Sequence, residues 1–161
     1  MMTRFIPILA LALLVTPAFA DPQSEISAYR QSHGLSAVTM DSKLTELASK
    51  QANAMAERGL LDHNVYASFR SRMSDYNTPS AAENIAMGTR TFEETLAAWK
   101  ASSGHNANLL KPRVTRIGLA SASRNGTKYW ALILAAPAEP QEPRVGVISI
   151  FPFGLLLRMG Q

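Results

Sequence analysis

The chain has 161 residues, of which 47% are hydrophobic, with a formal net charge of +4 and no cysteine. The absence of cysteine excludes a disulfide framework, lipidation at a cysteine and any thiolate metal site. Its 16 basic residues are scattered rather than clustered, which argues against a nucleic-acid partner. The fold must therefore be held by apolar burial around one core.

The start of the chain is typical of a signal peptide. Arg4 supplies a positive charge, residues 6–15 form an apolar run, and Ala18-Phe19-Ala20 is a small-x-small cleavage site. The alternative is an uncleaved anchor helix, but the run is short for a span that needs about 20 residues. We therefore expect a signal peptide over residues 1–20, cleavage after Ala20, export to the periplasm or medium, and no transmembrane span in the mature chain.

Two helices are expected at the start of the mature chain. Asp21-Pro22 begins the first, because proline loses no hydrogen bond at a helix start, and Gly34 ends it. Asp41 caps the second, which runs to about Arg58. Its apolar residues recur about every 3.6 positions along one stripe: Leu44, Leu47, Ala48, Ala52, Met55 and Ala56.

Shorter elements are expected in the middle of the chain. Residues 66–73 form a weaker helix, and residues 77–80 form a turn. The segment 83–87 ends at Gly88 and is either a brief strand or an ordered loop. The sequence does not decide between these two alternatives.

Two further helical segments follow. Thr91 and Glu94 form a capping box, in which each side chain satisfies a backbone N–H of the other residue. The helix that they begin ends near Gly104. Residues 105–110 form one more helical turn, which ends before Pro112.

A hairpin is expected next. Strands over residues 116–123 and 128–135 are joined through Asn125-Gly126, a strong two-residue hairpin signal. Both alternating faces of residues 129–134 are apolar, so that strand should be covered on both sides. Helices are therefore expected above and below the sheet.

The C-terminal part has a different composition. Residues 137–143 are a proline-rich linker, and residues 144–161 are an apolar tail interrupted by Pro152 and Gly154. The tail is too short for a transmembrane helix. It either folds back on the domain or is partly disordered, or it contacts a membrane or a partner.

Few residues are candidates for chemistry. The chain lacks a His-Glu-x-x-His motif, a Gly-x-Ser-x-Gly elbow, a P-loop and a dinucleotide fingerprint. Among the three histidines, His33 adjoins a helix end, where a structural role is expected. His63 and His105 each follow a helix break, and Glu83 begins the ordered segment between them. These three either bind a divalent cation or form a hydrogen-bonded cluster that orders the loops.

Five strings, in this order and spacing, resemble the CAP superfamily of cysteine-rich secretory, antigen 5 and pathogenesis-related proteins, and in particular its small disulfide-free bacterial members. The resemblance covers about Ser24 to Ala135, and the strings that carry it are LTELASKQANAMAERGLLDHN, AAENIAMG, TFEETLAAWKASSGHNANLL, RIGLASAS and YWALILA. The resemblance implies an α+β fold in residues 21–136: a three-layer α-β-α sandwich around a small antiparallel sheet.

The resemblance also implies a cleft with two histidines and two acidic residues, in which the histidines can ligate zinc or another divalent ion. His63 matches the first histidine, Glu83 matches the acid of the Gly/Ala-Glu-Asn motif, and His105 matches the histidine of the Gly-His motif. The family's second acid, shortly after the tryptophan, has no counterpart, because residues 100–103 after Trp99 contain none. Three of the four site residues are therefore carried over.

Four residues are candidates for supporting the cleft. Asn84 and Asn106 either orient the cluster by hydrogen bonds or cap loops through Asx turns. Ser102 and Ser103 line the cleft in this interpretation, without any arrangement that would activate a nucleophile.

The resulting functional expectation is an exported, non-enzymatic binding module for a lipid, a divalent metal or a cell-envelope partner. One alternative is a metal-assisted hydrolase that acts on peptides or cell-wall material. Another is a structural envelope protein, in which the cluster only ties loops together. Fold resemblance alone does not choose among them.

Overall fold

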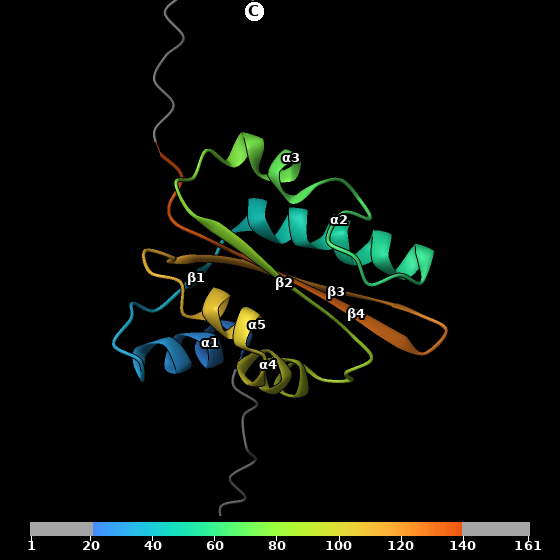
Figure 1. Ribbon diagram of the computed structural model, residues 1–161, viewed down its shortest axis with the longest axis horizontal. Helices are drawn as coiled ribbons and strands as arrows, with labels where there is room; N and C mark the ends of the chain where they lie inside the picture. Colours follow the sequence, from blue (N-terminus) through green and yellow to red (C-terminus); the bar gives the residue numbers. More distant parts are fainter. Residues whose placement is uncertain (1–20, 140–161) are drawn as a thin grey trace, which may run out of the picture.

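The computed structural model describes residues 21–139, so the expected signal peptide, most of the expected linker and the apolar tail lie outside the described residues. The described part is an α+β fold (Figure 1). Its helices are α1 Pro22–Gln31, α2 Ser42–Arg58, α3 Phe69–Met73, α4 Phe92–Ala101 and α5 Ser103–Leu109, with a 3-10 turn at Ser74–Tyr76. Its strands are β1 Thr39–Met40, β2 Ala81–Met87, β3 Arg116–Arg124 and β4 Thr127–Ala135.

The strands form one sheet in the order β1-β3-β4-β2. β4 pairs antiparallel with both β3 and β2, and the expected hairpin joins β3 to β4. The segment for which the sequence left strand and loop open is a strand, β2, and it begins at Ala81. The sheet is antiparallel except at one edge, where β1 pairs parallel with β3. β1 is not predictable from the sequence, because two residues leave no alternation to detect.

Helices cover both faces of the sheet, as the sequence predicts. Figure 1 shows α2 and α3 on one side of the sheet and α1, α4 and α5 on the other. β4 supplies alternating side chains to the two cores, with Ile133 in the core beneath α2 and Leu132 in the core beneath the other helices. None of the helices within residues 21–139 is long and apolar enough to cross a membrane.

The helix ends follow the local sequence. Asp21 and Asp41 accept hydrogen bonds from the backbone N–H groups of Ser24 (3.1 Å) and Leu44 (3.0 Å), respectively. The Thr91–Glu94 capping box is present at α4. Gly59 ends α2 with a φ of 66°, a left-handed conformation that favours glycine.

One glycine permits close contact between the backbones of α2 and β3. A Cβ atom on Gly118 of β3 would lie 2.1 Å from the carbonyl carbon of Leu44 and 2.2 Å from the amide nitrogen of Thr45. These are backbone atoms, so no side-chain rotation can relieve the overlap. The distance between α2 and β3 therefore requires glycine at this position.

Gly118→Ala should lower the free energy of unfolding by roughly 3 kcal/mol, because α2 must move away from β3. Chemical denaturation followed by circular dichroism measures this change. Gly104→Ala is the matched control: a Cβ there meets nothing within 4 Å, and alanine favours the helix by up to about 1 kcal/mol. Equal stability of the two variants would contradict the packing account.

Candidate functional site

Glu83 of β2 is the centre of the site. Its side chain is only 2% exposed, yet it accepts two hydrogen bonds from Arg72 of α3. The distances are 2.6 Å from Nη1 to Oε2 and 2.9 Å from Nη2 to Oε1. His63 Nδ1 lies 2.8 Å from the same Oε1. Both carboxylate oxygens of Glu83 are therefore engaged by side chains of the protein.

Arg72 also holds the loop that carries His63. Its Nε donates to the carbonyl of Ala67 at 3.0 Å, and its Nη2 donates to the carbonyl of His63 at 3.0 Å. Its side chain is 1% exposed. Arg72 was not among the residues expected from the sequence, although a buried carboxylate at Glu83 requires a cationic partner and Arg72 lies in the short helix just upstream.

The hydrogen bond to Glu83 sets the tautomer of His63. An ionised carboxylate only accepts, so the proton lies on Nδ1 and, in the neutral ring, Nε2 is left as an acceptor. The His63 side chain is 49% exposed, in contrast to its two buried partners. The buried ion pair of Arg72 and Glu83 thus holds the His63 imidazole at the surface in a fixed orientation.

His105 lies in α5 and is half-buried. Burial lowers the pKa of His105, and the nearby charge of His63 lowers it further. The carbonyl of His105 accepts a hydrogen bond from Asn84 Nδ2 at 3.0 Å. The structure therefore brings both predicted histidines to the same strand, β2.

A second hydrogen-bond chain links β2 to α5. Asn108 Nδ2 donates to Asn84 Oδ1 at 2.9 Å and to the carbonyl of Glu83 at 3.2 Å. Asn84 is fully buried, and its side-chain amide makes hydrogen bonds to His105 and Asn108. These bonds join β2 to α5. Asn108 was not among the sequence candidates, because nothing local distinguishes it from its neighbours.

The other predicted residues lie less centrally. Asn106 Oδ1 accepts from the Tyr29 hydroxyl at 2.7 Å, so its side chain joins α5 to α1. Ser103 is exposed and Ser102 is half-buried, and neither hydroxyl has a hydrogen-bond partner within residues 21–139. His33, expected to be structural, lies with Nδ1 2.9 Å from the carbonyl of Tyr29.

The geometry changes the part that Glu83 can take in metal binding. Within residues 21–139, no three histidine, aspartate or glutamate side chains gather closely enough to hold a metal ion. Arg72 and His63 occupy the Glu83 oxygens, so Glu83 is placed as a partner of His63 rather than as a direct ligand. Metal binding by His63, Glu83 and His105, as expected from the sequence, stays a prediction.

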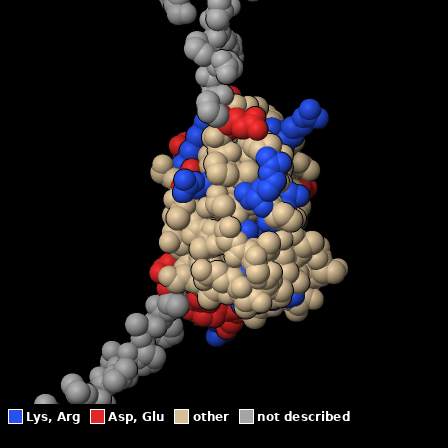
Figure 2. All heavy atoms as spheres, turned by 90° about the vertical axis from the view of Figure 1, so that its left-hand side faces the viewer, with Lys and Arg blue, Asp and Glu red and all other residues tan. Residues whose placement is uncertain are grey.

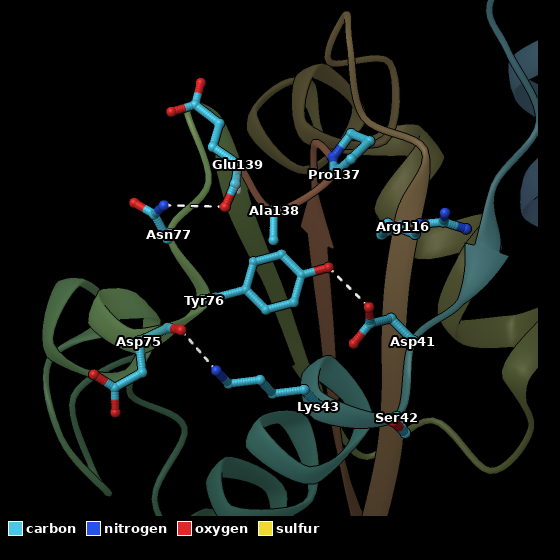
Figure 3. Close-up of a pocket in the computed structure, with 10 residues that line it drawn as sticks. All are labelled: Asp41, Ser42, Lys43, Asp75, Tyr76, Asn77, Arg116, Pro137, Ala138 and Glu139. Atoms are coloured by element: carbon cyan, nitrogen blue, oxygen red, sulfur yellow. Dashed lines mark hydrogen bonds between the residues drawn. The ribbon is translucent and has the colours of Figure 1, made fainter. Parts of the chain in front are cut away.

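A cavity of about 490 Å³ lies elsewhere, at the N-terminal end of α2 (Figure 3). Its lining includes Tyr76, which donates to Asp41 Oδ2 at 2.9 Å, and Lys43, which donates to the carbonyl of Asp75 at 2.6 Å. Burial and the hydrogen bond to Asp41 raise the pKa of Tyr76. The cavity contains none of the predicted site residues.

The surface charge agrees with the scattered basic residues of the sequence. Figure 2 shows basic and acidic side chains in the upper part of the face and mainly acidic ones at its lower left, with a broad, largely uncharged region between them. This face therefore offers no extended basic patch of the kind that binds nucleic acid.

The model of "CAP: Cysteine-rich secretory protein family" matches residues 23–134. The chain belongs to the CAP family. Among curated proteins, "Uncharacterized protein YkwD" of Bacillus subtilis (strain 168) is 35% identical over 97 residues, which cover 58% of this chain and 38% of that protein. The chain thus spans little more than a third of the length of this relative.

Solved structures show the same CAP fold. An outer surface protein from Borrelia burgdorferi matches with a TM-score of 0.65 and 19% identity, covering 71% of this chain and 89% of that one. An extracellular SCP-domain protein from Bacillus anthracis str. Ames matches with a TM-score of 0.62 and 21% identity, covering 71% and 38%. The structural neighbours therefore include extracellular and outer-surface CAP proteins.

Arg72→Met should lower the free energy of unfolding by about 3–5 kcal/mol, because it leaves Glu83 buried without a counter-charge. Adding Glu83→Leu should recover much of this loss, since the unpaired charge is then removed. Thermal and urea unfolding measure both changes. Arg70→Met, on the exposed side of the same helix, is the control and should change stability by less than about 0.5 kcal/mol.

His105 should make stability depend on pH. Its pKa is lowered in the folded state, so the unfolded chain binds the proton more readily and stability rises with pH. The loss of stability develops as the pH falls from the ordinary histidine pKa of about 6.5 to the lowered pKa of His105. Between pH 7.5 and 5.5, the parent should lose more stability than His105→Gln does. Parallel losses would show that His105 does not titrate in this way.

Proposed function

We propose that this chain is an exported, non-enzymatic binding module of the CAP family, with His63 and His105 forming a site for a divalent metal ion such as zinc. The protein supplies two imidazoles, and the remaining coordination positions are left to water or to a ligand from the cell envelope. Export is supported by the signal-peptide pattern of residues 1–20 and by the extracellular and outer-surface neighbours.

The observation that carries the proposal is the hydrogen bond from His63 to the Glu83 carboxylate. Histidines that bind metals usually donate their other ring N–H to a carboxylate or a carbonyl, which orients the ring and raises its basicity. Arg72 holds the Glu83 carboxylate in place. The lowered pKa of His105 favours the neutral, metal-binding form of that imidazole.

The same geometry favours binding over hydrolysis. A metal-assisted hydrolase needs a general base beside the metal-bound water. Glu83 is buried and engaged through both oxygens, so it is poorly placed for that role. Residues 100–103, where the family's second acid would lie, contain no carboxylate.

Isothermal titration with Zn²⁺ at pH 7.5 tests the site. We expect binding by the parent, at least a tenfold weaker affinity for His63→Ala and for His105→Ala, and no binding by the double variant. The third histidine provides the control. His33 lies just after α1, and the His33→Ala variant should bind zinc with the affinity of the parent. Full affinity in the double variant would sink the proposal.

Two further measurements separate the roles of the residues. Glu83→Gln should weaken the affinity for zinc about 10–100-fold, because it removes the carboxylate that orients His63 and leaves both histidine ligands in place. Lowering the pH to 5.5 should weaken binding, because a protonated imidazole cannot coordinate. Mass spectrometry of molecules that co-purify with the parent, but not with the double variant, would identify the envelope ligand.

A further inference from the structure

The two outer edges of the sheet are covered to different extents. At the β2 edge, the carbonyl of Glu83 accepts from Asn108 and the carbonyl of Ile85 accepts from the Trp99 indole at 3.2 Å. At the opposite edge, β1 lies against only the first two residues of β3. Side chains therefore cap part of the β2 edge, whereas most of the β3 edge has no strand neighbour within residues 21–139.

The uncovered part of β3 is long. The strand has nine residues and β1 pairs with two, which leaves seven, Gly118–Arg124, without a strand neighbour on that side among residues 21–139. The carbonyl of Ile117 accepts from Asp41 N at 2.8 Å, so Ile117 directs its backbone groups toward this edge. Because strand residues alternate in this direction, the free backbone groups belong to Leu119, Ser121 and Ser123.

Proteins usually protect such an edge with charge, proline, a bulge or a covering segment, since unpaired strand edges promote aggregation. Residues 119–123 are Leu-Ala-Ser-Ala-Ser, with neither charge nor proline. Ser121 and Ser123 are exposed. Their partners on β4 lie in an inner strand, which has a neighbouring strand on each side. Among Gly118–Arg124, only Arg124 at the far end carries a charge, so this edge is suited to pairing with a further strand.

We propose that residues 145–151 supply this cover by adding to β3 as a parallel strand. Their sequence, Val-Gly-Val-Ile-Ser-Ile-Phe, is uncharged and rich in β-branched residues, as strands are. Pro152 follows the segment directly and Arg144 separates it from Pro143; proline is suited to positions beside strand ends because it cannot donate to the ladder. Seven residues match the seven uncovered positions of β3.

The path of the described chain supports this occupant. Glu139, the last described residue, lines the same cavity as Arg116, the first residue of β3 (Figure 3). It is held there by reciprocal hydrogen bonds with Asn77, at 2.8 and 3.2 Å. The five residues 140–144 can reach up to about 17 Å. A strand that begins at this end of β3 runs in the direction of β3 and extends the line of β1.

Amide hydrogen exchange on the purified chain that retains its C-terminal residues tests the pairing. The amides of Leu119, Ser121 and Ser123 should exchange on the order of 100-fold more slowly than unprotected amides. Val147→Pro and Ile148→Pro change neighbouring residues, of which only one directs its N–H toward β3. One variant should abolish the protection and the other should reduce it less.

Leu156→Pro, beyond the pairing segment, is the control and should leave the protection unchanged. Slow exchange of the inner β4 amides in every variant verifies that the domain stays folded. Fast exchange of the three β3 amides in the parent would overturn the proposal, as would protection that survives both proline variants. Protection that is lost on dilution would assign the edge to a second copy, and protection that needs lipid vesicles would assign the segment to a membrane; either result overturns the proposal.

Discussion

The site depends on the burial of one carboxylate. Moving Glu83 out of water costs several kcal/mol, a cost that only an opposite charge and good hydrogen bonds can offset. Arg72 supplies both, and its remaining N–H groups fix the loop that carries His63. The position of this exposed imidazole is therefore set by charge compensation in the interior, rather than by the conformational preferences of the loop.

The place of the site in the sheet has a similar physical origin. His63 comes from the layer that contains α2 and α3, whereas His105 comes from the layer that contains α4 and α5 (Figure 1). Further inside the sheet, strands separate these layers. β2 is an edge strand, so side chains from the two layers can approach each other beyond it. Asn84 and Asn108 join this strand to α5. An edge strand therefore positions groups that an inner strand would keep apart.

Membership of the CAP family shows the fold, and the side chains at β2 carry the functional argument. The chain lacks an acid in residues 100–103, and its remaining acid, Glu83, is bound to arginine. This combination leaves two imidazoles with an outer carboxylate partner. In the proposed function, these two imidazoles hold a metal ion to which a ligand binds, with Glu83 orienting His63.

The sequence by itself determined the helices, their caps, the hairpin and the burial of β4 on both faces, because these features depend on neighbouring residues and on simple periodicity. Through its resemblance to a family, it also pointed to His63, Glu83 and His105. Only the tertiary structure selected Arg72 as the partner of Glu83, brought Asn108 into hydrogen-bond contact with Asn84, and added β1 to the sheet edge. Those contacts join residues at least 11 positions apart. The sequence contains several side chains of the same kind, and the packing of the layers decides which of them makes each contact.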